Sequence, residues 1–255
     1  METIKELRLA VLIDADNVSS TTIKGIMEEI AKYGTPTFKR IYGDWTKPNL
    51  SGWKTVLLEN AITPIQQYSY TTGKNSTDSA MIIDAMDILY SGQVEGFCII
   101  SSDSDFTRLA IRLREAGMKV FGFGEKKTPT PFISACDKFI YIEILSTTKK
   151  VQPKATSVTK KEKNKPVVPA KEPLGKIDKE IIKLIADSVD DLADDSGWAF
   201  LGQLGNLILK KQPNFDPRNY GFTKLVRLIK SINQFEVQER DTGKGNIKQV
   251  YVKAK

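Results

Sequence analysis

One ten-residue stretch, Phe97–Phe106, constrains the fold of this chain more than any other. It starts with an apolar run of strand length and then enters a turn of serines that holds Asp103 and Asp105. A helical pattern of apolar residues follows at once. Ligands of open parallel sheets bind beyond the carboxyl ends of the strands, so this position predicts a functional site at the two carboxylates.

Two carboxylates on one tight loop repel each other. At an effective dielectric of about 20, like charges about 4 Å apart interact by roughly 4 kcal/mol. A cation bound between Asp103 and Asp105 would remove this repulsion. The alternative interpretation is that Asp103 is only a turn residue and Asp105 only a helix N-cap, and this stretch alone favours neither.

Composition restricts the chemistry that such a site can use. The chain of 255 residues has no histidine, which excludes Ser-His-Asp and Cys-His catalysis and histidine-ligated zinc. Its two cysteines, Cys98 and Cys136, are too few for a cysteine-rich metal site and imply no disulfide framework, so we expect a reducing, cytoplasmic compartment. A net charge of +7 favours an anionic partner, nucleic acid first.

Apolar runs and amphipathic patterns alternate along the first half of the chain. Because strands that alternate with helices pack into a doubly wound, mostly parallel α/β sheet, we predict that fold class here. The expected strands are 8–13, 37–42, 62–67, 97–101, 119–124 and 138–142, and the expected helices are 22–33, 50–60, 78–90 and 106–116.

Four acids fall at one rim of this predicted sheet. Asp14 ends the first strand, Asp103 and Asp105 follow the fourth, and Asp78 opens a helix whose apolar stripe would face the sheet. Hard divalent cations prefer oxygen ligands, and carboxylates supply them. We therefore predict a site for Mg²⁺ or Mn²⁺ formed by these four residues.

Three segments of the first half resemble a NYN domain of the PIN-like nuclease superfamily, in its LabA/DUF88 branch. They are LIDADNVS (12–19), KNSTDSAMIIDAMD (74–87) and IISSDSDFTRLAIRLREAGMKVFGFG (99–124). The resemblance implies that Asp14, Asp78, Asp103 and Asp105 hold Mg²⁺ or Mn²⁺ and support hydrolysis of RNA phosphodiester bonds. Asn17 and Asp84 also match family positions.

Three residues near this rim are candidate RNA contacts. Asn17 can cap the first helix or contact a ligand, and the sequence leaves both open. Lys74 begins the segment KNSTD (74–78), which ends at Asp78. Many relatives have a shorter Lys-Gly-Val-Asp-like sequence at this place. Arg108 lies on the helix after Asp105, where an ordinary surface position is the alternative for it.

Residues 146–173 differ in character from both flanking regions. Between positions 146 and 176, nine lysines stand against two glutamates, so this stretch alone carries the net charge of the whole chain. Four prolines and almost no apolar periodicity predict a disordered linker. Its lysines suit nonspecific contact with nucleic acid, and a merely solvating tether is the alternative.

Residues 174–255 return to helical periodicity, with residues 198–201 expected to enter the second helix. They end in a pattern typical of a β-hairpin with its turn around Gly243. Three helices and a hairpin predict a small winged-helix-like α+β domain. Residues 174–252, above all GWAFLGQLGNLILKKQPNFDPRNYGFTKLVRLIKS (197–231), resemble an OST-HTH (LOTUS) domain, which implies binding of RNA or of a protein partner. The candidate RNA contacts are Lys210, Lys211, Arg218, Tyr220, Lys224 and Lys244.

Together these features predict a metal-dependent ribonuclease with a C-terminal RNA-binding module. An endonuclease is favoured, with an exonuclease as the alternative. The first alternative is a noncatalytic RNA-binding or scaffold protein whose acidic site is vestigial. A further alternative is a rim-site enzyme acting on small molecules, which leaves the basic linker and the second domain without a role. Whether the chain forms a homodimer, or binds a protein partner through the LOTUS domain, stays open. No apolar run is long enough to span a bilayer.

Overall fold

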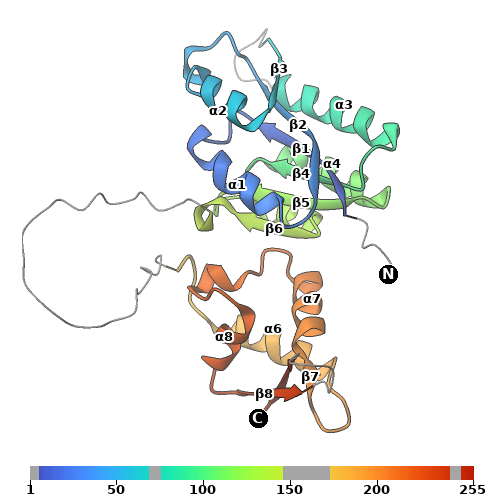
Figure 1. The fold of residues 1–255 in the computed structure, drawn as a ribbon, viewed down its shortest axis with the longest axis vertical. Helices are drawn as coiled ribbons and strands as arrows, with labels where there is room; N and C mark the ends of the chain where they lie inside the picture. The colour runs from blue at the N-terminus through green and yellow to red at the C-terminus, as the bar shows by residue number, and fades with distance from the viewer. Residues whose placement is uncertain (1–5, 69–75, 146–172, 242–247) are drawn as a thin grey trace, which may run out of the picture.

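The computed structural model describes residues 6–68, 76–145, 173–241 and 248–255, and these form two domains (Figure 1). The predicted linker, apart from residue 173, lies outside the described residues. Lys74, Lys244 and the predicted turn around Gly243 lie outside them as well.

A six-stranded sheet with the order β3-β2-β1-β4-β5-β6 forms the centre of the first domain. Every neighbouring pair of these strands is parallel, which confirms the doubly wound α/β prediction. The strands are β1 Arg8–Asp14, β2 Thr35–Gly43, β3 Thr63–Gln66, β4 Gly96–Ile100, β5 Lys119–Gly124 and β6 Lys138–Tyr141.

Helices cover both faces of this sheet because alternate residues of its central strands are buried on opposite sides. Leu9, Val11 and Ile13 of β1 pack with α1 (Ile23–Ile30) and α2 (Trp53–Asn60). Ala10 and Leu12 pack with the other layer. That layer consists of α3 (Ser76–Ser91), α4 (Thr107–Glu115) and α5 (Thr130–Ala135).

Two details differ from the sequence expectation in the first domain. Helix α5 falls in a stretch for which no element was predicted. Strand β2 begins at Thr35, although the strand was expected to begin at residue 37. Proline is tolerated at Pro36 because β3 pairs only with the far part of β2, from Arg40 onward, so the missing N–H leaves no ladder bond unmade on that side.

The second domain combines three helices with a three-stranded antiparallel sheet, as predicted for a small α+β domain. Its elements are α6 Lys179–Asp190, β7 Ala199–Phe200, α7 Leu201–Lys211, α8 Leu225–Lys230, β8 Phe235–Asp241 and β9 Lys248–Ala254. Ala199 and Phe200 were expected to enter the second helix, and this was wrong. They pair with β9, where the ring of Phe200 lies 5.8 Å from that of Tyr251.

The second domain docks along β6, which is an edge strand of the first domain's sheet (Figure 1). The backbone N–H of Phe139 on β6 donates to the carbonyl oxygen of Pro213 (2.9 Å). Beside it, the side-chain amide of Asn214 donates to the hydroxyl of Tyr141 (2.8 Å). The second domain therefore satisfies part of the hydrogen bonding that an edge strand leaves open.

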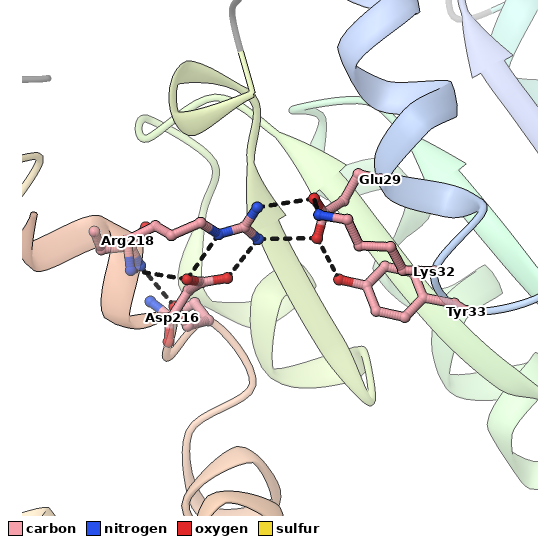
Figure 2. A network of polar contacts seen from close by, with 7 residues as sticks. Glu29, Lys32, Tyr33, Asp216 and Arg218 are labelled. Carbon is pink, nitrogen blue, oxygen red and sulfur yellow. Dashed lines mark hydrogen bonds and ion pairs between the residues drawn. The ribbon is translucent and has the colours of Figure 1, made fainter. Parts of the chain in front are cut away.

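An ion pair between the buried Glu29 and the partly buried Arg218 joins the two domains at the end of α1 (Figure 2). The guanidinium of Arg218 donates to both oxygens of Glu29, at 2.8 and 2.9 Å, and to both oxygens of Asp216, at 2.9 and 2.6 Å. Glu29 is only 3% exposed and also accepts from Lys32 (2.6 Å) and the hydroxyl of Tyr33 (2.6 Å). Burial alone would raise the pKa of Glu29, but these donors outweigh it and lower the pKa to about 2.

The pKa of Glu29 makes the stability of the docked protein depend on pH. Because the folded pKa of about 2 lies below the ordinary value of 4.5, the stabilisation is complete above about pH 4.5 and disappears as the pH falls toward 2. We expect Glu29→Gln to lower the free energy of unfolding by about 3 kcal/mol at pH 7, with the difference from wild type shrinking toward zero near pH 2. Denaturant titration at a series of pH values measures it.

Glu28→Gln is the matched control, because Glu28 precedes Glu29 on the same helix and is exposed. Its effect should stay within about 0.5 kcal/mol at every pH. An equal loss of stability in the two variants would contradict the role given to the Glu29–Arg218 pair.

Candidate active site

Asp14 forms the buried base of the acidic rim. It is the last residue of β1, and its side chain accepts hydrogen bonds from the Asn17 amide (2.6 Å), the Ser101 hydroxyl (2.9 Å) and the backbone N–H of Asp16 (3.0 Å). Burial raises the pKa of Asp14, and the three donors act in the opposite direction. Asn17 thus orients Asp14.

The turn after β4 is built around the side chains of Ser101 and Asp103. The hydroxyl of Ser101 accepts from the backbone N–H of Asp103 (3.1 Å) while it donates to Asp14. Asp103 in turn accepts from the backbone N–H of Asp105 (2.9 Å) and caps the 3-10 helix Ser104–Phe106. The capping role considered for Asp105 therefore belongs to Asp103, which uses one carboxylate oxygen for it.

Three carboxylates converge beside this turn. One oxygen each of Asp78, Asp103 and Asp105 lies within 4.8 Å of the others, which brings the first turn of α3 to the turn after β4. Asp78 is half-buried, and its pKa is raised to about 6, first by burial and then by the negative charges of Asp14, Asp103 and Asp105. Mutual repulsion and an all-oxygen donor set fit a hard divalent cation.

Asp14 stands one layer behind this group. Within the part of the chain that the structure describes, the group of converging acids contains Asp78, Asp103 and Asp105 and leaves Asp14 out. Asp14 reaches it through Ser101, which contacts both Asp14 and the backbone of Asp103. Direct ligation by Asp14 stays a prediction.

The contacts of two residues at the rim, Ser101 and Asp84, were not predicted from the sequence. Ser101 is the hydroxyl that links the two strand ends, and its position directly after an apolar strand was the available signal. Asp84, a family-matched position, is tied to β2 by the side chains of Arg40 and Tyr42. This network fixes α3, which carries Asp78, against the sheet.

The predicted RNA contacts lie in different settings. Arg108, Lys210 and Lys224 are exposed. Lys211 pairs with Asp191 (2.6 Å), Arg218 belongs to the domain interface, and Tyr220 is half-buried with its ring 6.0 Å from that of Phe215. RNA contact by these residues stays a prediction, and for Lys211 and Arg218 it requires that they share or exchange their carboxylate partners.

Removing one charge from the converging acids should stabilise the metal-free protein. We expect Asp78→Asn, at pH 8 in EDTA, to raise the free energy of unfolding by about 1 kcal/mol, since solvent screens a half-buried carboxylate. Adding Mn²⁺ should raise the melting temperature of the wild type and change that of the variant much less. Thermal melts with and without Mn²⁺ test both statements.

Asp87→Asn serves as the control, because Asp87 is exposed on the same helix. It should respond to Mn²⁺ as the wild type does. A variant at Asp78 that is destabilised in EDTA and still gains the full Mn²⁺ response would show that these acids do not act together.

Comparisons with known proteins match both halves of the chain. The NYN domain family matches residues 8–143, and the OST-HTH/LOTUS domain family matches residues 172–247. No curated protein matches the chain. In the described residues, no helix is long and apolar enough to cross a membrane.

Three solved structures are similar to parts of the chain. A protein of unknown function from Vibrio parahaemolyticus is 19% identical with a TM-score of 0.47, and the match covers 56% of this chain and 96% of that one. An uncharacterized protein from Nitrosomonas europaea is 34% identical (TM-score 0.30, 38% and 92% covered). A protein from Chromobacterium violaceum is 29% identical (TM-score 0.25, 34% and 84% covered). The NYN match spans more than half of the residues of this chain, and the chain therefore belongs to the NYN domain family.

Proposed function

We propose that this protein is a metal-dependent ribonuclease that cuts within RNA chains. The observation that carries the proposal is the convergence of Asp78, Asp103 and Asp105 at the carboxyl end of the sheet. Membership in the NYN family and the OST-HTH/LOTUS match of the second half support RNA as the substrate. The absence of histidine directs the chemistry toward carboxylates and a cation.

The three converging carboxylates would hold Mg²⁺ or Mn²⁺. When bound, such a cation lowers the pKa of a coordinated water and stabilises charge that develops on the scissile phosphate. The protein contributes the positions of its acids. Ser101 and the capping bond hold Asp103 in place, and Asp84 with Arg40 and Tyr42 holds the helix that carries Asp78.

Asp78 is also a candidate to accept the proton of the attacking water. It is half-buried, and one of its oxygens lies within 4.8 Å of oxygens of Asp103 and Asp105, so a water bound by the same group would lie within its reach. Asp14, whose direct ligation of the cation stays a prediction, also has a positioning role. It accepts three hydrogen bonds and supports the turn from behind.

The second domain supplies an RNA-binding surface in a fixed place. It is joined to the first by the Glu29–Arg218 ion pair and by hydrogen bonds at β6. RNA held by the second domain therefore approaches the catalytic domain from a defined direction. A noncatalytic RNA-binding protein is the competing function, and the same assay separates the two.

Cleavage of a labelled single-stranded RNA tests the proposal. We expect the wild type to cut in Mn²⁺ and in Mg²⁺ and to leave the RNA intact in EDTA. Asp103→Asn should reduce the cleavage rate at least 100-fold, because it removes charge from the metal-binding group and changes the turn that Asp103 caps. RNA binding in EDTA should be unchanged.

Asp87→Asn is the control for this assay and should cut at the wild-type rate, since Asp87 is exposed and outside the group of converging acids. Cleavage that persists in Asp103→Asn or in EDTA would overturn the metal-dependent mechanism. Intact RNA with retained binding in the wild type would show that the protein is a binder.

A further inference from the structure

A cleft of about 470 Å³ runs between the two domains beside the Glu29–Arg218 ion pair (Figure 2). Side chains of α1 and β6 form the wall from the first domain, and side chains of α7, α8 and the loop between them form the wall from the second. Apolar residues, among them Leu209, Phe215 and Leu225, contribute to the second wall. Neither domain has this cleft by itself.

Positive charge exceeds negative charge in this cleft. Its cations are Lys32, Lys138, Arg218 and Lys224, and its carboxylates are Glu29 and Asp216. Arg218 engages both carboxylates, and Lys32 pairs with Glu29 at 2.6 Å. Among the described residues, no ion pair joins Lys138 or Lys224 to a carboxylate, so two lysines of the cleft are not held by a direct ion pair.

Lys138 is the better placed of these two lysines for binding an anion. It is half-buried, and its ammonium lies 4.8 Å from the centre of the Tyr33 ring. Burial lowers its pKa, the charges of Asp216 and Glu29 raise it, and those of Arg218 and Lys32 lower it further. An anion beside this ammonium would replace lost hydration and offset the repulsion from the neighbouring cations.

We propose that the interdomain cleft binds phosphate groups of single-stranded RNA, with Lys138 from the first domain and Lys224 from the second as the principal contacts. This inference rests on RNA being the substrate in the proposed function. It adds a binding site that belongs to both domains and lies apart from the converging acids. RNA bound there spans the domain boundary.

The size and composition of the cleft favour a polynucleotide over a small inorganic ion. A volume of about 470 Å³ accommodates a group of nucleotide size, and the apolar wall of Leu209, Phe215 and Leu225 suits a sugar or base next to a phosphate. Lysines act as point charges toward phosphate, without requiring one fixed geometry. Such contacts hold RNA of any sequence.

RNA binding in EDTA tests the proposal without interference from cleavage. The double variant Lys138→Met/Lys224→Met removes both lysine charges and keeps most of the apolar stem of each side chain. We expect about tenfold weaker binding of a single-stranded oligonucleotide near 0.1 M salt. The slope of log affinity against log salt should fall by about 1.4, because each phosphate contact on a single strand contributes roughly 0.7.

Lys24→Met/Lys179→Met is the matched control. It removes the same charge from exposed positions, one on α1 and one on α6, outside the cleft. It should bind RNA within twofold of the wild type with a nearly unchanged salt slope. Lys138→Arg should retain binding, because it keeps the charge, and thermal melts check that every variant is folded.

Equal affinity and salt slope in the cleft variant and the control variant would overturn the proposal. The result is independent of catalysis, because binding is measured without metal. A protein that fails to cut RNA and yet loses RNA binding in the cleft variant would contradict the proposed ribonuclease activity and leave this site standing. A protein that cuts RNA normally but binds it equally well as wild type and as cleft variant would contradict this binding site and leave the proposed ribonuclease activity standing.

Discussion

The parallel pairing of β1 with β4 is the constraint on which the acidic rim depends. Leu9–Ile13 lies beside Gly96–Ile100, and these residues are buried along the whole register. Two buried parallel strands in register must end side by side. Asp14 and Ser101 directly follow the paired residues of β1 and β4. They therefore lie within hydrogen-bonding distance, although 87 residues separate them in the sequence.

Repulsion among the acids is balanced by donors that the same strand ends provide. Two carboxylates about 4 Å apart repel by roughly 4 kcal/mol at an effective dielectric of about 20, and the rim holds several. Asp14 accepts three hydrogen bonds and Asp103 accepts one from the turn that it caps. Asp78 lies between these charges and binds its proton more tightly than an isolated aspartate. The fold thus holds the acids in an arrangement that favours a bound cation. Repulsion among these acids lowers the free energy of unfolding when no cation is bound.

Most of the first domain could be predicted because strand and helix periodicities follow from local sequence. The strand that ends at Asp14 and the turn at Asp103 are continuous segments, so their acids could be identified as candidate ligands without a structure. The link through Ser101 could not be predicted, because a serine after a strand resembles an ordinary turn residue until its partner on β1 is known. Ala199 and Phe200 were placed in a helix for a similar reason: their pairing partners, Val252 and Tyr251, lie about fifty residues further along the chain.

The domain interface is the clearest case of a feature that sequence periodicity cannot predict. Glu29 and Arg218 are 189 residues apart, and each alone resembles an ordinary surface residue. Arg218 was accordingly interpreted as an RNA contact, whereas the structure joins it to Glu29 and Asp216.

An ion pair with a buried carboxylate contributes little net stability after desolvation. Without Arg218, however, the buried Glu29 loses both guanidinium hydrogen bonds, so the pair strongly disfavours other ways of docking. The hydrogen bond from Phe139 to Pro213 adds a second fixed point along β6. Two points of contact with strict geometry define an orientation. That orientation determines the shape of the interdomain cleft and fixes where the second domain lies relative to the acids of the first.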